Sequence, residues 1–393
     1  MEEVYDAIVV GAGPAGSTAA FYLGEAGKKV LVLEKERMPR YKTCGGGLAA
    51  SLLEQFPFSF EPVIQSDVHA ISFAMGGRRV TIPLSDRPLR MVMREDFDAH
   101  ILAHARAEVH QEIQVLKARE HEEHVRVETN RGAYSGRYLI GGDGANSTVA
   151  RALGLRPRRM LAAAIEVEAP VPAEVLHRFA GTPLFIFGEI DMGYLWVFPK
   201  AEHLSVGIGA VHPGPGVLQT TLDRVMTRYG ISLVGVPRHG HPIPLHVRRE
   251  PIATRRVLLT GDAAGLVDPF SGEGIRFAVK SGRWAAEAVL SERPEMYQKM
   301  VDRKLGLEHT LAVGLAWLFY RFPRLCFALG VRNPFTSLAF ADMLSDRAGY
   351  PEVILRMFGT LPIFFATEAV AGLIGKFAGI ETKNRIRAAI YPR

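Results

Sequence analysis

Two segments of the chain carry side chains that could do chemistry. Cys44, one of only two cysteines, stands directly before three consecutive glycines in the segment RYKTCGGGL. A thiol can donate or relay a proton, and a glycine run lets another group approach the main chain closely. In GYLWVFPK (193–200), a strand would place Tyr194, Trp196 and Phe198 on one face, as a wall for an apolar chain. A thiol that only packs and an ordinary aromatic sheet core stay open as alternatives.

The N-terminal region has the pattern of a dinucleotide-binding unit. In residues 6–36 an apolar strand is followed at once by Gly11-x-Gly13-x-x-Gly16, a helix and a second strand ending at Glu34. Gly11 allows the tight turn, Gly13 lets a pyrophosphate approach the main chain, and Gly16 lets the helix pack on the strand. Glu34 stands 18 residues after Gly16, where a carboxylate accepts hydrogen bonds from ribose hydroxyls. Because no arginine-rich segment replaces Glu34, the sequence favours FAD or NAD.

Two later segments place aspartates at the ends of expected strands. YLIGGDGANSTVARALGL (138–155) predicts a strand, a turn and a helix capped by Asn146 or Ser147. RRVLLTGDAAGLVDPFSGEGI predicts a strand ending at Asp262 and a helix that begins near Gly274. An aspartate at the end of a parallel strand points into the ligand crevice, and a helix N-terminus stabilises the electron-rich side of a reduced flavin. Each Gly-Asp pair alone fits an ordinary capped turn equally well.

Together these segments resemble the group A flavoproteins with the p-hydroxybenzoate-hydroxylase-like fold. GAGPAG, GDGANSTVAR and GDAAGLVDPFSGEGI match the FAD motifs of that family, and REDFD (94–98) matches its Arg-x-x-Phe-Asp, whose arginine lies near the ribityl-phosphate part of the flavin. The resemblance covers about residues 1–290, and a second, nicotinamide-binding Rossmann unit is absent. The FAD-binding residues that it implies are Gly11, Gly13, Ala15, Gly16, Glu34, Cys44, Gly45, Gly46, Gly47, Arg94, Asp262, Gly274 and Ile275.

The resemblance also implies a fold of the α/β (α+β) class. A Rossmann-like FAD-binding domain carries an inserted antiparallel-sheet substrate domain and is followed by a helical C-terminal region. The expected boundaries are residues 1–75, 90–155 and 250–295 for the FAD-binding domain, 76–89 and 156–249 for the substrate domain, and 296–393 for the helical region.

Within that fold the chain resembles the geranylgeranyl reductases. RYKTCGGGL is similar to their Lys-x-Cys-Gly-Gly motif and GYLWVFPK to their Tyr-x-Trp-x-Phe-Pro motif. Thr43 stands where chlorophyll-linked members usually carry proline, so the resemblance is to the broad bacterial and archaeal branch. It implies an FAD-dependent reductase of C=C bonds in an isoprenoid chain of a polyprenyl lipid, quinone or diphosphate. The implied catalytic residues are Cys44, Tyr194 and Trp196, and the implied substrate contacts are Gly47, Tyr194, Trp196 and Phe198.

Two other functions are compatible with the same motifs. A flavin-dependent monooxygenase or halogenase shares the scaffold, although halogenases carry Trp-x-Trp-x-Ile-Pro where this chain has Tyr-x-Trp-x-Phe-Pro. A non-catalytic flavoprotein that binds lipid would leave Cys44 and the glycine run without a role. Alkene reduction needs a hydride, which a reduced flavin supplies, and a proton, for which Cys44 is a candidate donor. The electron donor, NAD(P)H or a ferredoxin, is not identified by the sequence.

Composition narrows the partners and the compartment. The chain of 393 residues has a formal charge of +6, but no Lys/Arg-rich run with interleaved aromatic residues, so we expect no nucleic-acid partner. Two cysteines cannot build a disulfide framework and favour a reducing compartment, and the start MEEVYD is unlike a signal peptide. We therefore expect a cytoplasmic protein. The histidines at 100, 104 and 110 and the EHEEH segment are interpreted as solvated, without metal.

The last hundred residues contain two apolar segments, 311–320 and 360–379. Arg321 ends the first, and Glu368 and Lys376 interrupt the second, so we expect neither to span a bilayer. They suit helices that lie on a membrane or close a pocket, while buried core helices are the alternative. The basic residues that could add attraction to anionic lipid are Lys383, Arg385, Arg387 and Arg393. The resulting expectation is peripheral contact at the inner membrane surface.

Overall fold

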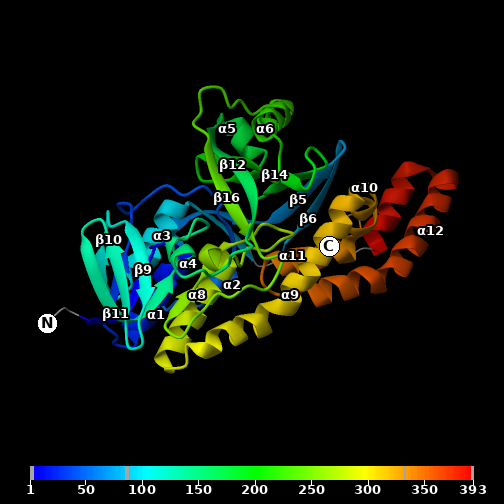
Figure 1. Ribbon diagram of the computed structural model, residues 1–393. Helices are drawn as coiled ribbons and strands as arrows, with labels where there is room; N and C mark the ends of the chain where they lie inside the picture. The colour runs from blue at the N-terminus through cyan, green and yellow to red at the C-terminus, as the bar shows by residue number, and fades with distance from the viewer. Residues whose placement is uncertain (1–3, 85–87, 332, 391–393) are drawn as a thin grey trace.

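The fold was analysed on a computed structural model that describes residues 4–84, 88–331 and 333–390, with side chains described as far as Ala371 and at Leu373. Figure 1 shows a sheet with its helices on the N-terminal side, a second sheet above it, and helices that extend away to the C-terminal end. This is the mixed α/β architecture that the sequence predicted.

The first sheet has the strand order β8-β2-β1-β11-β10-β9, with β17 beside β11. Its central strands are short apolar runs buried on both faces, and Val9 of β1 lies between Val32 of β2 and Ile140 of β11 in parallel register. The strands are β1 (Val4–Val10), β2 (Val30–Leu33), β8 (Glu108–His110), β9 (Val115–Glu120), β10 (Val125–Thr129), β11 (Gly132–Gly141) and β17 (Val257–Leu259). The helices of this region are α1 (Pro14–Glu25), α3 (Arg94–Ala103), α4 (Thr148–Ala152), α7 (Gly261–Ala264) and α8 (Ile275–Leu290).

Glycines set the spacing between the first sheet and its helices. Gly11 has φ +93°, and a Cβ on Gly16 would lie 1.9 Å from the carbonyl oxygen of Gly11. A Cβ on Gly282 of α8 would lie 2.2 Å from the carbonyl oxygen of Ala15 of α1. The tight turn at Gly11 and the close helix packing at Gly16 are therefore as predicted, and α1 and α8 are in direct contact.

The second sheet has the order β16-β12-β15-β14-β13-β5-β6 and is antiparallel except for the β5–β13 pair. Leu195 and Val197 of β14 face a core shared with α6, and Figure 1 shows α5 and α6 above this sheet. The strands are β5 (Ala70–Met75), β6 (Arg78–Pro83), β12 (Met160–Pro170), β13 (Leu184–Phe187), β14 (Gly193–Pro199), β15 (His203–Val211) and β16 (His239–Leu245). The helices are α5 (Ala173–His177) and α6 (Val217–Arg228).

One expected domain boundary needs correction. The sequence placed residues 70–75 in the FAD-binding domain, but they form β5 in the second sheet, where Phe73 pairs with Phe185 of β13. The reason is the tight turn at Gly76 and Gly77, which joins β5 and β6 into one hairpin. A run of alternating apolar residues does not show which of two sheets it will join.

A small third sheet has the order β3-β7-β4, and its strands are interleaved along the chain with strands of the two larger sheets. It contains β3 (Gly47–Ala49), β4 (Ile64–Val68) and β7 (Leu89–Val92), with the short helices α2 (Ala50–Leu53) and η1 (Glu61–Val63) nearby. Gly47 pairs with Met91, so the end of the glycine run is fixed as a strand.

In its described part the C-terminal region is made of helices joined by short turns. It consists of α9 (Glu295–Arg321), α10 (Pro323–Cys326), a π-helical turn η2 (Phe327–Val331), α11 (Pro334–Leu344) and α12 (Tyr350–Ile390). The apolar segment 311–320 forms the end of α9 and buries Ala312, Leu315, Ala316 and Phe319. The side chains of Lys376, Lys383, Arg385 and Arg387 lie outside the described part of the chain, as does all of Arg393.

The expectation that neither apolar segment spans a bilayer stays a prediction, and the structure adds one candidate stretch that overlaps the second segment. Within the described residues, the stretch Tyr350–Ala371 is long and apolar enough to cross a membrane by length and composition, with mean hydropathy 1.5 and 17% of the tested window buried. The bent pair α9 and Pro323–Val331, at 108°, passes the same test together. Counting charge-free residues missed this stretch because its charges are widely spaced. Length and composition do not distinguish a span from an apolar helix that packs on protein.

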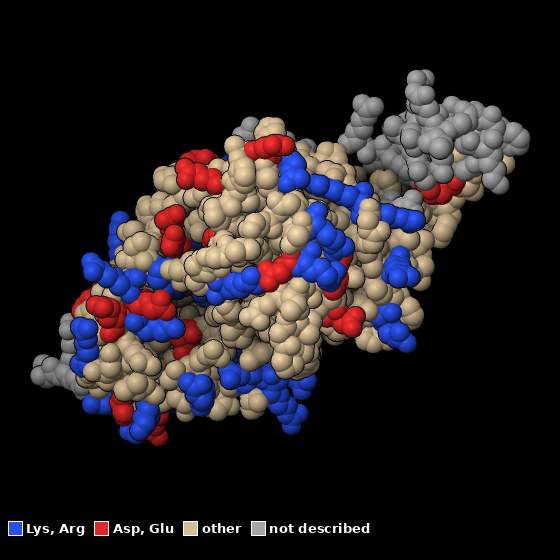
Figure 2. Space-filling model, turned by 90° about the horizontal axis from the view of Figure 1, so that it is seen from above, with Lys and Arg blue, Asp and Glu red and all other residues tan. Residues whose placement is uncertain are grey.

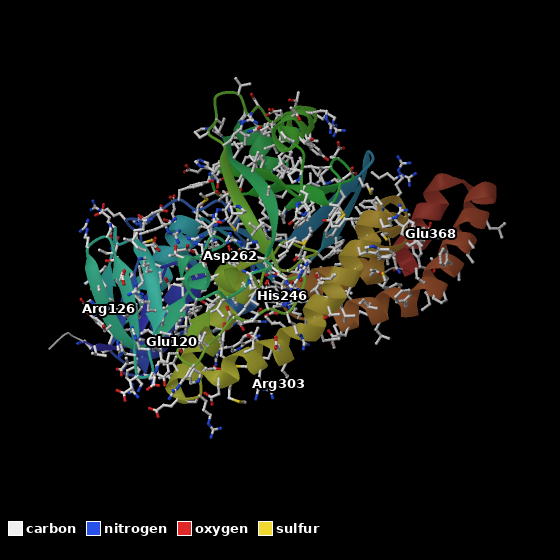
Figure 3. The ribbon with its side chains drawn as sticks, in the orientation of Figure 1. Glu120, Arg126, His246, Asp262, Arg303 and Glu368 are labelled. Atoms are coloured by element: carbon white, nitrogen blue, oxygen red, sulfur yellow. The ribbon has the colours of Figure 1, made fainter. Side chains whose placement is uncertain are left out.

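Two neighbouring histidines lie where α9 packs on the rest of the molecule. His309 of α9 is buried, its ring is 4.4 Å from that of His246, and neither ring nitrogen of His309 has a hydrogen-bond partner among the described residues. Figure 3 shows His246 next to α9. Burial, with smaller contributions from His246 and Arg276, lowers the pKa of His309 from 6.5 to about 3.

This burial predicts acid sensitivity. Because the unfolded chain protonates His309 first, the folded state loses stability as the pH falls below about 6.5, by on the order of 3 kcal/mol near pH 4. We expect His309→Leu to flatten this loss in chemical unfolding curves measured at several pH values. The exposed His121→Leu serves as the control and should leave the slope unchanged. An unchanged pH slope in His309→Leu would show that other groups cause the acid sensitivity.

Candidate functional site

A cavity of about 600 Å³ opens between the first sheet, the second sheet and the glycine run. Its wall includes nearly every residue that the sequence singled out. Those residues are Gly11, Gly13, Ala15, Glu34, Cys44, Gly45, Gly46, Gly47, Arg94, Tyr194, Trp196, Phe198, Asp262, Gly274 and Ile275. Gly16 does not line the cavity, because it packs against Gly11 behind the turn.

One end of the cavity has the features of a nucleotide site. Glu34 is buried at the end of β2, and the N–H of Ala12 donates to its carboxylate at 2.6 Å. Helix α1 begins beside it with Gly13 as its N-cap residue and no side-chain cap, so its first N–H groups are open to a ligand. A Cβ on Gly13 would meet only the side chain of Arg40, at 3.6 Å.

Arg94 is held rigidly on the same wall. Its guanidinium makes two 2.8 Å hydrogen bonds to Asp98 one turn along α3, and both side chains are buried. Arg40 approaches the same carboxylate at 3.3 Å and Glu34 at 3.7 Å. The Arg-x-x-Phe-Asp pattern therefore builds a fixed cation beside the nucleotide end.

Both Gly-Asp turns line the cavity, and Asp143 also organises the start of a helix. Asp143 accepts from the N–H groups of Thr148 and Val149, at 2.7 and 3.1 Å, and Ser147 caps α4, which decides between the two cap candidates. Asp262 lines the cavity and lies close to Gly274, the N-cap of α8. Helix α8 has no side-chain cap, and Figure 3 shows Asp262 where the two larger sheets approach each other.

The glycine run is required first by its protein neighbours. A Cβ on Gly45 would lie 2.7 Å from the ring of Phe198, and one on Gly46, where φ is +65°, would lie 2.0 Å from the carbonyl oxygen of Val92. The sequence attributed these glycines to the approach of a bound group. The structure adds a more immediate cause, namely that the run passes tightly between β14 and β7.

A buried lysine fixes the run in place. The ammonium of Lys200, directly after β14, donates to the carbonyl oxygens of Gly45 at 2.7 Å and of Val92 at 2.8 Å. Burial lowers the pKa of Lys200. Lys200 at the end of the aromatic motif thereby holds the glycine run, 155 residues earlier in the sequence, through main-chain carbonyl groups.

A buried carboxylate holds the backbone of Cys44. Glu166 of β12 accepts hydrogen bonds from the N–H of Cys44, the hydroxyl of Tyr41 and, at 2.6 Å, the hydroxyl of Ser205. Burial, and next Glu168, raises the pKa of Glu166. The Cys44 sulfur accepts a hydrogen bond from the N–H of Gly46 at 3.4 Å, and Cys44 lines the cavity.

The aromatic side chains of β14 alternate as the pattern predicted. Tyr194, Trp196 and Phe198 line the cavity, while Leu195 and Val197 pack in the core on the other face. The Tyr194 hydroxyl donates to the carbonyl oxygen of Ser271, and burial raises its pKa. The indole N–H of Trp196 is buried with no hydrogen-bond partner in the described part of the chain.

A polar corner of the cavity was not predicted from the sequence, in which Lys42 was named only as part of the RYKTCGGGL motif and His241 was not singled out. Lys42 and His241 both line it, and the Nε2 atom of His241 is buried without a hydrogen-bond partner among the described residues. Burial, and next the charge of Arg94, lowers the pKa of Lys42. Burial, and next Lys42, lowers the pKa of His241 to about 4, so this imidazole is neutral at physiological pH.

Two of the missed residues left a signal in the sequence. Glu166 is a charged residue inside the apolar segment MLAAAIEVEAP, and Lys200 ends the aromatic strand motif. A charge at a core-facing position of a strand indicates a buried hydrogen-bonding role. His241 gave no comparable signal, because its segment HGHPIPL is typical of a loop.

A flavin dinucleotide fits these residues. The cavity joins a nucleotide end, with Glu34 and the open N-terminus of α1, to an apolar end with aromatic walls. The uncapped N-terminus of α8 lies between them, where it can stabilise negative charge. Among the described residues, no group of three or more His, Cys, Asp or Glu side chains is placed to hold a metal ion.

Comparison with known proteins agrees with this geometry. Residues 9–41 match the family model described as NAD(P)-binding Rossmann-like domain. The chain is 32% identical over 304 residues to geranylgeranyl diphosphate reductase of Rhodobacter capsulatus, covering 73% of this chain and 75% of that protein. It is 29% identical to menaquinone reductase of Mycolicibacterium smegmatis (73% and 76% covered) and 29% identical to digeranylgeranylglycerophospholipid reductase of Thermoplasma acidophilum (78% and 85% covered).

Two solved structures show the fold. A geranylgeranyl bacteriochlorophyll reductase-like protein from Thermoplasma acidophilum superposes with a TM-score of 0.72 at 26% identity, covering 81% of this chain and 88% of its own. The flavin-dependent brominase Bmp2 shares the fold alone, with a TM-score of 0.67 at 19% identity over 87% of this chain and 94% of its own. By its sequence identity and coverage, the chain belongs to the geranylgeranyl reductase family of flavin-dependent oxidoreductases.

Proposed function

We propose that this protein is an FAD-dependent reductase of isoprenoid C=C bonds. The observation that carries the proposal is the single cavity that joins a dinucleotide-binding turn, the Cys44–glycine run and an aromatic wall. Glu34 accepts hydrogen bonds from the adenosine ribose and Gly13 leaves room for the pyrophosphate, and FMN has neither of these groups. Tyr194, Trp196 and Phe198 hold the apolar chain of the substrate and exclude water from it.

The protein's own residues account for positioning and for the proton. A bound reduced flavin supplies the hydride. Glu166 and Lys200 hold the backbone on either side of Cys44, so its thiol stays on the cavity wall. The thiol donates or relays the proton that the second alkene carbon requires.

We expect Cys44→Ser to keep FAD but to slow alkene reduction or to change which double bonds are reduced. The hydroxyl preserves size and the contact with Gly46, but it is a much weaker acid than a thiol. Rates and product patterns across a pH series measure the effect. Cys326→Ser is the matched control, because that thiol lies in the C-terminal helices, where it contacts the Leu318 carbonyl of α9 at 3.6 Å. Wild-type rates and products in Cys44→Ser at every pH would assign Cys44 a packing role only.

The substrate is proposed as a class: an isoprenoid diphosphate, ether lipid or quinone. Lys42 places a cation on the cavity wall two residues before Cys44, which favours an anionic head group. Mass spectrometry of lipids and quinones from cells with and without the gene identifies the molecule whose double bonds disappear. A monooxygenase or halogenase would instead give oxygen-dependent products, and a non-catalytic flavoprotein would leave the extracts unchanged.

The C-terminal helices are proposed to contact a membrane peripherally at the inner surface. Large apolar side chains are exposed along them, and basic side chains lie among them. The exposed apolar residues are Trp317, Phe322, Leu325, Leu355, Phe358, Ile363, Phe365, Val370 and Leu373. The exposed basic residues are Arg321, Arg324, Arg347 and Arg356. Figure 2 shows basic side chains gathered on one face where the body meets the C-terminal helices.

We expect salt-sensitive binding to anionic liposomes, because each basic residue near the surface contributes about 1 kcal/mol. The double substitution Phe358→Ser with Phe365→Ser should weaken sedimentation with liposomes about tenfold. Val234→Ser is the control, since Val234 is 90% exposed but lies outside these helices. Equal sedimentation of all three proteins would place the contact elsewhere, and no sedimentation of the wild type would reject it.

A further inference from the structure

The C-terminal helices are attached to a loop of the cavity by a buried hydrogen-bond network. The loop 268–274 precedes α8, and its carboxylate Asp268 is 1% exposed. Asp268 accepts from the N–H of Phe270 at 2.9 Å and from the N–H and hydroxyl of Ser271 at 2.7 and 2.9 Å. One buried carboxylate therefore sets the conformation of the whole loop.

The remaining donor to this carboxylate comes from the C-terminal region. The hydroxyl of Tyr350, the first residue of α12, lies 2.8 and 3.0 Å from the two oxygens of Asp268, and Tyr350 is itself buried. Ser271, which Asp268 holds, presents its carbonyl oxygen to the hydroxyl of Tyr194. A continuous chain of contacts thus runs from α12 to the aromatic wall of the cavity.

A second attachment reaches the first turn of α8. Arg276 is buried, and its guanidinium contacts Glu273 at 2.8 Å and Asp346 at 3.0 Å. Asp346 lies in the turn between α11 and α12, and Lys280 binds the same carboxylate at 2.6 Å. The cavity wall and the C-terminal region therefore share two independent polar joints.

We propose that Tyr350 and Asp346 are positioning residues of the reductase site, which hold the loop 268–274 and the first turn of α8 against the cavity. The inference rests on the proposed function, since it assigns these residues to the same site. The C-terminal region is then part of the catalytic geometry and more than a cover for the substrate. Neither residue touches the cavity, so both act through Asp268, Arg276 and Lys280.

The same helices provide a matched control. Arg356 of α12 and Asp342 of α11 form a 2.7 Å ion pair whose side chains are both exposed. This pair joins α11 to α12 without contacting the loop or α8. Asp342→Asn therefore loosens the C-terminal region without touching the two joints.

The experiment compares flavin-loaded Tyr350→Phe, Asp346→Asn and Asp342→Asn in the full chain. We expect Tyr350→Phe and Asp346→Asn to shift the midpoint potential of the bound flavin and to lower kcat per bound flavin about tenfold. KM should stay within about twofold, because the aromatic wall itself is intact. Asp342→Asn should match the wild type in potential and kcat. If one variant fails to load flavin, the other decides.

Potentials and kcat values in both variants equal to those of Asp342→Asn would overturn the inference, whatever the thermal stability. The potential is measured without substrate, so it separates this inference from the proposed function. A shifted potential in a protein that reduces no isoprenoid would reject the proposed function and leave the positioning role standing.

Discussion

Gly13→Val is expected to abolish flavin binding in a protein that still folds. A Cβ at this position meets only the flexible end of Arg40 at 3.6 Å, so the apoprotein has room for the added Cβ. A pyrophosphate that approaches the main chain of this turn leaves no room for the valine side chain. We expect flavin affinity to fall at least about 100-fold, or ~2.8 kcal/mol, as measured by quenching of flavin fluorescence on titration of apoprotein.

Gly314→Val tests whether the effect is specific. Gly314 lies in α9, far from the cavity wall, and a Cβ there meets nothing within 4 Å. It should bind flavin as the wild type does. Glu34→Arg should also lose the cofactor, because it places a cation where ribose hydroxyls need an acceptor. Normal flavin binding by Gly13→Val, or FMN released from the wild type on denaturation, would refute the FAD assignment.

Lys200→Met is expected to produce the second large effect. The substitution keeps most of the side-chain volume but leaves the carbonyl oxygens of Gly45 and Val92 buried without their donor. Each unsatisfied carbonyl costs about 1–3 kcal/mol, partly offset because a charge is no longer buried. We expect the free energy of unfolding to fall by about 2–4 kcal/mol and turnover to fall about tenfold or more, because the Cys44 backbone is no longer fixed.

Urea unfolding and steady-state turnover per bound flavin measure the two effects of Lys200→Met. Lys117→Met, at an exposed position of β9, is the control for loss of a lysine from a strand region and should change neither. If Lys200→Met kept wild-type stability and turnover, the glycine run would be positioned by its other contacts, which are the pairing of Gly47 with Met91 and the packing against Phe198.

Much of the fold was predictable because its signals are local. The Gly11–Gly16 turn, the strand that ends at Glu34 and the start of α8 at Gly274 each depend on a few neighbouring residues. The same holds for the alternation of Tyr194 and its neighbours on β14. These patterns report backbone geometry, and that geometry is what the sequence encodes most directly.

The contacts that complete the site were not predictable because they join distant segments. Glu166 meets Cys44 across 122 residues, and Lys200 meets Gly45 across 155. Tyr350 reaches Asp268 across 82. Each of these polar groups had only a weak signal in its own segment, since a buried charge can be recognised from sequence but its partner cannot. The membership of β5 in the second sheet was also missed, because it depends on pairing with the distant strand β13.

The central claim is tested most directly by a single turnover without oxygen. Purified protein carrying reduced FAD is mixed anaerobically with a geranylgeranyl diphosphate, a geranylgeranyl ether lipid or a menaquinone, and the product masses are measured. We predict that at least one of these substrates gains two hydrogen atoms for each double bond reduced while the flavin is oxidised. Unchanged masses for all three, or a product that forms only with oxygen and carries an added oxygen atom, would contradict the assignment.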